Sequence, residues 1–296
     1  MIRDEDLKKA TDYSHGQKEA AYSVLGEIVN LLEPFADDLR IIGGWVPTLL
    51  YPDREHIGSI DVGVLLDQVK IQKKQGYETI NKLLRRNGYQ RSRAHFFTYT
   101  QRGMIDGIAY DVDVDFLSGK YGGEDGNVSK HVDGLKTLPA TGGNYAFDFP
   151  PIRRKIDYRR PDGAMDVSRV NIVSVVPYIV MKTSAMNRGK AKDAYDIYFC
   201  IDGFPGGIRQ LTREFLPHRD AALVKQMRER LSEKFASEDH AGPVDIVSFM
   251  EIHDPDERNR IKQDAYQKVN YLVEHLRLPD EHQGRVIGEG FSGFSI

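Results

Sequence analysis

The sequence predicts an α+β fold, in which a small mixed sheet flanked by helices is followed by a mostly helical C-terminal region. Through Leu117, stretches with the two-residue alternation of strands are mixed with stretches at the three- and four-residue spacing of helices. After Asp166 the helical spacing dominates. We therefore expect an α+β domain over residues 1–165 and a mostly helical domain over residues 166–296.

The first half of the chain opens with a predicted amphipathic helix, because apolar residues recur at helical spacing until Pro34 ends the pattern. Glycines, prolines and an Asn-Gly pair separate the segments that follow. In order, the expected elements are a helix over 17–33, a strand over 39–42, a helix around 45–51, a strand over 59–67, a helix over 77–86, and strands over 95–102 and 108–117.

The second half begins with a segment rich in Gly, Asp, Asn and Pro. We expect residues 118–161 to form a loop-rich connection, with a short strand-like piece at 145–149. Helical spacing then returns. The expected helices cover residues 173–187, 191–201, 209–215, 221–235 and 257–276.

The composition is that of a soluble globular protein with a sizeable core. Of the 296 residues, 40% are hydrophobic and 29% are charged, and the mean hydropathy is −0.48. The longest apolar run, Val170–Met181, is shorter than the roughly 20 residues that span a bilayer, so we expect no membrane association. The N-terminus lacks the apolar core of a signal peptide and Cys200 is the single cysteine, which together favour the reducing cytoplasm.

Acidic and basic residues nearly balance. The 41 Lys and Arg residues against 44 Asp and Glu residues give a net charge of −3, so any contact with nucleic acid must be local. A basic cluster at 153–155, Arg159 and Arg160 is one candidate for such a contact, although runs of this kind are more often solvated loops.

A glycine pair, Gly43-Gly44, stands at the junction between a predicted strand and a predicted helix. Glycines there let backbone N–H groups approach a phosphate closely, and the N-terminus of the next helix adds a favourable dipole; the commoner explanation is a tight turn. Downstream, Ser59-x-Asp61 puts a carboxylate early in an otherwise apolar strand, where burial is costly unless the carboxylate is paired or bound to metal.

An acidic face is predicted on the strand over 108–117. Strand side chains alternate, so Asp111, Asp113 and Asp115 share one face, and a divalent cation would relieve their mutual repulsion. A solvated edge strand is the alternative. A calcium loop of the EF-hand type is excluded, because Phe116 and Gly122 stand where Gly and Glu are required.

Two carboxylates follow in the helical region. Asp193 and Asp196 are three residues apart on one predicted helix, hence on one face, and Lys182 lies on the helix before. A surface ion pair worth roughly 0–1 kcal/mol is the alternative explanation.

Together these residues resemble the minimal-nucleotidyltransferase (polymerase-beta-like) superfamily, and within it the AbiEii-type nucleotidyltransferase toxins. The family pattern is a Gly-Gly or Gly-Ser turn, then Ser/Thr-x-Asp-x-Asp on a strand, a third acidic residue on a later strand, and a downstream lysine followed by Lys/Arg-Asp-x-x-Asp-Leu/Ile-Tyr. The matching residues, within about 38–200, are Gly43-Gly44, Ser59-Ile60-Asp61, Asp113 or Asp115, Lys182, and Lys192-Asp193 with Asp196-Ile197-Tyr198.

The resemblance implies a Mg²⁺-dependent enzyme that moves an NMP from an NTP to an acceptor hydroxyl. It implies that Asp61, Asp113 and Asp115 bind Mg²⁺, that Gly43, Gly44, Ser59 and Lys182 hold the nucleotide, and that Asp193 and Asp196 orient Lys182 or the acceptor. It further implies a tRNA, another RNA or a protein as acceptor, and the role of toxin beside a cognate antitoxin. A small-molecule hydroxyl is a less favoured acceptor.

The chain departs from the pattern at residue 63, where Gly63 stands in place of the second Asp. Asp67 cannot replace it, because four strand residues would carry it roughly 13 Å along the strand. Gly63 is compatible with an inactivated copy, with an engineered inactive variant, or with an enzyme in which the later acidic strand supplies the missing ligand. The alternative hypothesis is therefore a catalytically impaired nucleotide- or RNA-binding module of the same fold.

Overall fold

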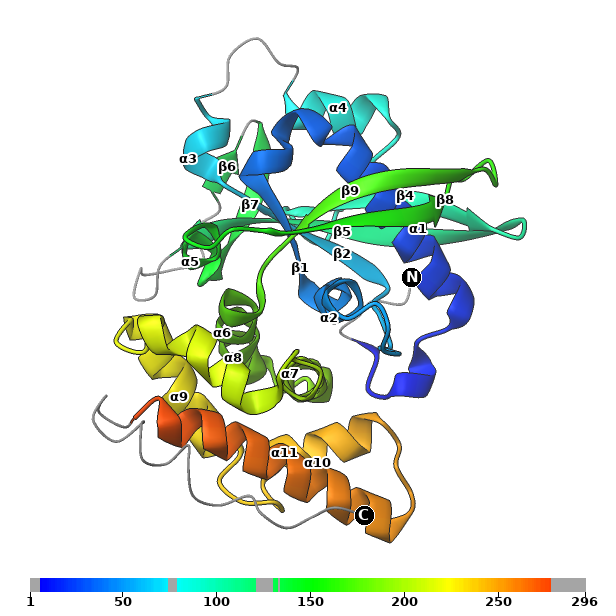
Figure 1. The fold of residues 1–296 in the computed structure, drawn as a ribbon. Coiled ribbons are helices and arrows are strands. Elements are labelled where there is room, and N and C mark those ends of the chain that lie inside the picture. The colour runs from blue at the N-terminus through cyan, green and yellow to red at the C-terminus, as the bar shows by residue number, and fades with distance from the viewer. Residues whose placement is uncertain (1–5, 74–78, 121–129, 133, 278–296) are drawn as a thin grey trace.

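A mixed sheet with helices on both sides forms one half of the molecule, and a cluster of helices forms the other (Figure 1). The structure, a computed structural model, describes residues 6–73, 79–120, 130–132 and 134–277. The predicted fold class is confirmed: a mixed sheet flanked by helices precedes a helical C-terminal region. No helix in these ranges is both long enough and apolar enough to cross a membrane.

The sheet has the strand order β3-β4-β5-β2-β1-β9-β8, and β7 pairs with both β5 and β6. At its centre β2 and β5 are parallel, whereas β1 is antiparallel to β2 and β4 is antiparallel to β5. The bounds are β1 Leu39–Ile42, β2 Asp61–Leu66, β3 Gln90–Arg91, β4 Thr98–Ile105, β5 Ile108–Lys120, β6 Lys130–Val132, β7 Leu135–Thr141, β8 Ile152–Arg159 and β9 Met165–Ile172.

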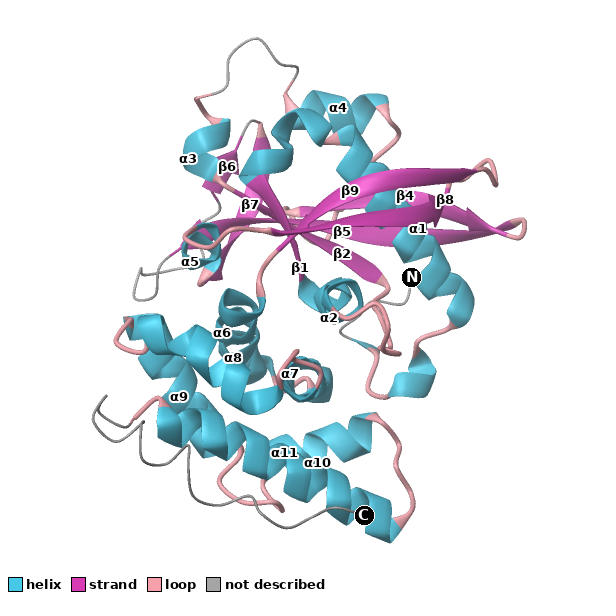
Figure 2. Cartoon of the chain, viewed as in Figure 1, coloured by secondary structure: helices cyan, strands magenta, loops and turns pink. Residues whose placement is uncertain are grey.

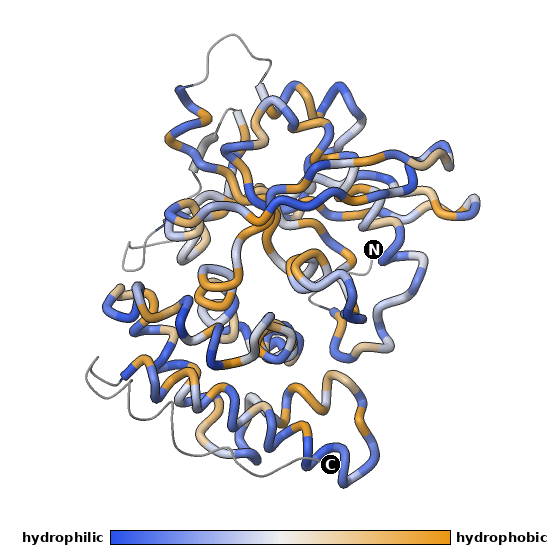
Figure 3. Tube along the Cα trace, viewed as in Figure 1, coloured by the Kyte–Doolittle hydropathy of each residue, from blue (hydrophilic) through white to orange (hydrophobic). Residues whose placement is uncertain are grey.

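One face of the sheet is covered by α1 (His15–Leu31), which contacts β4, β5, β8 and β9. The side chains of β5 that point to this face, Val112, Val114 and Phe116, are fully buried, as the predicted alternation requires. Polar anchors fix the helix on the sheet: Gln101 Nε2 donates to Glu27 Oε1 at 2.8 Å. Figure 3 shows apolar segments toward the middle of the sheet.

The helical region lies beyond the opposite face of the sheet (Figure 2). Within it α7 packs against α6 and α10, and α11 packs against α8, α9 and α10. The bounds are α6 Val175–Ala185, α7 Ala191–Asp202, α8 Gly207–Phe215, α9 Ala222–Lys234, α10 Ala241–Phe249 and α11 Pro255–His275; the sheet half also contains α2 Val46–Leu50, α3 Gln68–Ile71, α4 Ile80–Arg86 and α5 Gly143–Phe147.

The predicted loop-rich connection over 118–161 is wrong in most of the part that the structure describes. It contains strands β7 and β8, and the piece expected to be strand-like at 145–149 belongs instead to the helix α5. β8 was missed because it is an edge strand with one paired side: only Ile156 and Tyr158 are buried, so its pattern reads as polar.

The helical pattern expected after Asp166 is also wrong at its start, because residues through Ile172 form β9 between β1 and β8. The predicted domain boundary after residue 165 therefore falls at the first residues of a strand, and the sheet ends at Ile172. The sequence also failed to predict α10. The first residues of the helix predicted over 77–86 lie outside the described residues, and the helix is seen from Ile80.

Candidate functional site

A cavity of about 730 Å³ lies between the centre of the sheet and the helices α6 and α7. It brings together residues that are far apart in the sequence, from the turn after β1, from β2, β5 and β7, and from the two helices. Of the predicted site residues, Asp196 alone does not line it; the others do, namely Gly43, Gly44, Ser59, Asp61, Asp113, Asp115, Lys182 and Asp193.

The floor of the cavity is an acidic row on the parallel strands β2 and β5. Asp61 stands opposite Asp113 and Gly63 stands opposite Asp115 in the strand register. Asp111, Asp113 and Asp115 all line the cavity, so the prediction that they share one face of β5 is confirmed. The alternative of a solvated edge strand is wrong, because β5 lies between β4 and β2.

Hydroxyl groups fix the orientation of each carboxylate in the acidic row. Ser59 Oγ donates to Asp61 Oδ1 at 2.5 Å. From the antiparallel neighbour β4, Thr100 Oγ1 donates to Asp113 Oδ1 at 2.8 Å and Thr98 Oγ1 donates to Asp115 Oδ1 at 2.5 Å. Such hydrogen bonds favour the ionised carboxylate and restrict its rotation.

Mg²⁺ is the cation that the family resemblance implies. Among the described residues, no group of three or more His, Cys, Asp or Glu side chains is arranged to hold a metal ion, so the predicted triad of Asp61, Asp113 and Asp115 is not a preformed three-ligand cage. The donor chemistry nevertheless fits: Mg²⁺ prefers oxygen ligands and is usually held by one or two carboxylates together with substrate phosphates and water. Asp61 and Asp113, side by side on neighbouring strands, would hold it.

The Gly43-Gly44 turn closes one end of the acidic row. Gly43 has φ +83°, a conformation that favours glycine. A Cβ added to Gly44 would lie 2.7 Å from Ser59 Oγ and 3.1 Å from Lys192 Nζ, so glycine is required for this close approach. The expected helix dipole contributes little, because the glycine pair itself begins a 3₁₀ turn, Gly43–Trp45, which leads into a helix of only five residues, α2. A lysine ammonium supplies positive charge beside the turn instead.

A buried network of ion pairs forms the wall of the cavity opposite the acidic row. Lys182 Nζ lies 2.7 Å from Asp193 Oδ1 and 2.7 Å from Asp196 Oδ2, and Lys192 Nζ lies 2.9 Å from Asp196 Oδ1. The side chains of Asp193 and Asp196 are 2% and 0% exposed. The surface ion pair offered as the alternative explanation is therefore wrong, because these charges are removed from solvent and hold one another in place.

The shifted pKa values of Lys182 and Asp196 keep both groups charged. Burial acts against the charged form of Lys182, but the neighbouring charges of Asp193 and Asp196 outweigh it and raise the pKa of Lys182 above its ordinary value. Burial likewise opposes ionisation of Asp196, yet Lys182 and Lys192 hold its pKa below the ordinary 3.8. Both groups are charged at neutral pH. Since Asp196 does not line the cavity, its role is to position the two lysines.

His56, which was not among the predicted site residues, joins this network. Its Nε2 lies 3.0 Å from Asp196 Oδ1, and its Nδ1 accepts a hydrogen bond from the backbone N–H of Gly58 at 3.0 Å. With Nδ1 accepting, Nε2 carries the proton and the ring is neutral. Burial lowers the pKa of His56 from 6.5 to about 4. His56 thus connects Asp196 to the loop that delivers Ser59.

Lys192 matches the family pattern but was not predicted as a site residue. The signal for it was its spacing: Lys192 precedes Asp196 by four residues, which puts both on one helix face. For His56 no such signal existed, because its partner lies 140 residues away. Tyr178 was missed as well; it lines the cavity with 1% of its surface exposed, and its hydroxyl has no hydrogen-bond partner among the described residues.

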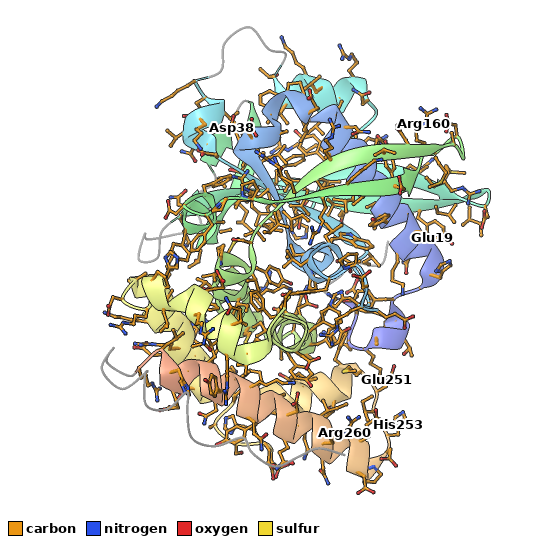
Figure 4. All side chains as sticks on the ribbon, in the orientation of Figure 1. Glu19, Asp38, Arg160, Glu251, His253 and Arg260 are labelled. Carbon is orange, nitrogen blue, oxygen red and sulfur yellow. The ribbon has the colours of Figure 1, made fainter. Side chains whose placement is uncertain are left out.

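The predicted basic cluster lies elsewhere. Its arginines belong to β8 and the turn after it, do not line the cavity, and are held by other groups. Arg153 pairs with Asp37 at 3.5 Å, Arg159 pairs with Asp106 at 3.0 Å, and Arg160, at the tip of the β8–β9 hairpin in Figure 4, pairs with Asp162.

Protein-family models, curated proteins and solved structures were all compared with the chain, and none matches it.

Proposed function

We propose that the protein is a Mg²⁺-dependent nucleotidyltransferase that acts in the cytoplasm. The observation that carries the proposal is the pairing of opposite walls in one cavity: carboxylates of β2 and β5 on one side, and the buried ammonium groups of Lys182 and Lys192 beside a glycine turn on the other. Transfer of a nucleotidyl group needs both, since the triphosphate requires positive charge and its cation requires oxygen ligands.

The nucleotide fits with its phosphates between the Gly43-Gly44 turn, Ser59 and the two lysines. Lys182 and Lys192 are fixed by Asp193 and Asp196, so they present charge without reorganising, which favours stabilisation of the transition state. When bound to Asp61 and Asp113, Mg²⁺ would neutralise phosphate charge and align the attacking and leaving oxygens.

In the reaction, the acceptor hydroxyl oxygen forms a bond to the α-phosphorus of the NTP. The bond between that phosphorus and the bridging oxygen breaks, and pyrophosphate leaves with the electron pair. Asp115, which lines the cavity and stands opposite Gly63 in the strand register, is the carboxylate that would accept the hydroxyl proton. The family resemblance extends the proposal to an RNA (including tRNA) or protein acceptor, and to a toxin restrained by a cognate antitoxin.

A second candidate function is a nucleotide- or RNA-binding module without catalysis, and Gly63 is the observation that favours it. A Cβ added to Gly63 would lie 3.1 Å from the carbonyl oxygen of Ile42 on the paired strand β1. The glycine therefore has a packing reason, and the close approach is made by the backbone of β1. Position 63 of β2 therefore has no room for the second Asp of the family pattern unless β1 shifts by a few tenths of an ångström.

The proposal is tested by NTP binding with Mg²⁺ together with transfer of α-labelled nucleotide to total RNA and to protein. We expect Asp61→Asn to abolish transfer, and Lys192→Met to weaken NTP binding by roughly ten- to a hundredfold, because a hydrogen bond to a charged group contributes about 1.5–3 kcal/mol. Lys225→Met is the matched control, since Lys225 is an exposed residue of α9 that pairs with Asp220. NTP binding without transfer to any acceptor would favour the binding module.

A further inference from the structure

A second concave surface, of about 580 Å³, lies next to the cavity on the β3–β4 side of the sheet. We name it the arginine groove and define it by Arg91, Arg93, Arg102, Gln101, Thr100 and Asp111. We propose that the arginine groove binds the acceptor and that the acceptor is an unpaired strand of nucleic acid. The inference rests on the proposed function, whose acceptor class it specifies.

The first observation that supports nucleic-acid binding is the local positive charge. Between Thr79 and Ile105 the chain has six basic residues and no acidic one, although the whole protein has a net charge of −3. The three arginines of the groove are exposed. Its one carboxylate, Asp111, lies 3.6 Å from Arg102, and both side chains are largely open to solvent. A surface of this kind attracts phosphates through charge, independently of base sequence.

The second observation is a set of aromatic rings beside the groove. The loop between β3 and β4 places His95, Phe96 and Phe97 in succession; Phe96 is 36% exposed, and its ring centroid lies 5.3 Å from that of Phe97. His95 and Phe97 line the first cavity, whereas Arg91 and Arg93, a few residues earlier, line the groove. Cationic grooves combined with exposed aromatic rings are typical of single-strand binding, because unpaired bases stack on the rings.

The third observation is that the arginine groove is continuous with the acidic row. Asp111 lines both the groove and the first cavity. Thr100 lines the groove, and its hydroxyl donates to Asp113 inside the cavity. Asp111 and Asp113 are two residues apart on β5, which is about 6–7 Å along the β-strand. The end of a nucleic-acid strand that lies in the groove therefore reaches the reacting centre. The β8 arginines offer no such path, since they line neither cavity.

The test measures binding alone, without NTP. A fluorescein-labelled single strand of about 12 nucleotides is titrated with the full chain, as RNA and as DNA, beside an RNA duplex and an acidic peptide of equal charge. Three variants are compared with the wild type. The first is the groove triple Arg91→Gln, Arg93→Gln and Arg102→Gln, and the second is Phe96→Ala. The third, called the β8 control, is the charge-matched triple on β8 and the turn after it, Arg153→Gln, Arg159→Gln and Arg160→Gln. All the replaced arginines are exposed, and thermal unfolding checks that each variant folds.

We expect single strands to bind more tightly than the duplex or the peptide, and affinity to fall steeply between roughly 50 and 200 mM salt. The groove triple should lose affinity and reduce the log–log salt slope by about 2, as for three lost phosphate contacts. Phe96→Ala should weaken binding at least about fivefold without changing that slope. The β8 control should bind like the wild type. Preference for RNA or for DNA then identifies the acceptor.

The inference is overturned if the groove triple binds single strands like the wild type, if the duplex or the peptide binds as tightly, or if the β8 control loses the affinity instead. These outcomes are independent of the proposed function. NTP binding and label transfer can persist without strand binding, which removes the arginine groove only, and strand binding can persist when no transfer is found, which removes the enzyme only.

Discussion

The buried His56 couples the stability of the fold to pH. In the unfolded chain its pKa is the ordinary 6.5, whereas in the fold burial lowers its pKa to about 4. Between these values the unfolded chain binds a proton that the folded chain excludes, so the stability that the neutral ring contributes is complete above pH 6.5 and is lost as the pH falls toward 4. Asp196, whose pKa is lowered below 3.8, stays ionised across this window.

We predict that the free energy of unfolding falls from pH 7 to pH 4 by up to about 3 kcal/mol through His56. The variant His56→Asn keeps an amide donor for Asp196 but cannot be protonated in this range. It should be less stable than the wild type at pH 7 and should lose less stability on acidification. Urea unfolding at a series of pH values measures the free energy of unfolding of both proteins. An identical dependence of that free energy on pH for the two proteins would contradict the prediction.

Gly63 separates a packing effect from a chemical one. We predict that Gly63→Ala and Gly63→Asp both lower stability by about 1–3 kcal/mol, because each adds a Cβ against the carbonyl of Ile42 in a packed region. Only Gly63→Asp should raise Mg²⁺-dependent transfer, since it alone adds a ligand beside Asp61. Thermal unfolding and label transfer are measured on the same preparations. A rise in transfer with Gly63→Ala, or none with Gly63→Asp, would show that residue 63 is not a ligand position.

At the scale of elements, the register of β4 on β5 places a threonine opposite each of two carboxylates, Thr100 with Asp113 and Thr98 with Asp115. We predict that Thr100→Val, which keeps the shape and removes the hydroxyl, lowers the apparent affinity for Mg²⁺ in the transfer assay by roughly tenfold, as expected for about 1.5 kcal/mol. Thr98→Val is the comparison: it should alter the pH profile of transfer rather than the metal dependence. The reverse pattern would exchange the roles of Asp113 and Asp115.

The elements also show what a sequence can predict. The central strands β1, β2 and β5 were expected close to their observed bounds, because buried faces impose regular alternation. Edge strand β8 was hidden by its exposed face, and β9 was assigned no element because it leads directly into the apolar start of α6. The acidic row followed from alternation within one strand, but His56 depends on a partner 140 residues away, which no local pattern encodes. The arginine groove depends on the antiparallel pairing of β3, β4 and β5, in which β3 was not predicted.

At the scale of the molecule, the loop before β2 is fastened to the helical region. Tyr51 donates to the carbonyl of Cys200 at 3.1 Å, Arg54 lies 2.5 Å from Asp202, and His56 lies 3.0 Å from Asp196. At a second point Glu251, labelled in Figure 4, accepts hydrogen bonds from Thr11 and Lys9 near the N-terminus. The helical region is therefore part of the site, because it fixes the loop that carries Ser59.

The parallel pairing of β2 with β5 determines when the site can form during folding. Asp61 meets Asp113 only after the intervening chain has closed, and the lysines that complete the cavity come from later still. Non-local contacts of this kind are slow to form, because loop-closure entropy is lost before they can stabilise the chain. Trp45, the single tryptophan, is buried beside the glycine turn and reports on this step. On refolding, recovery of its native fluorescence should lag behind recovery of helical circular dichroism, and NTP binding should return with the slower signal.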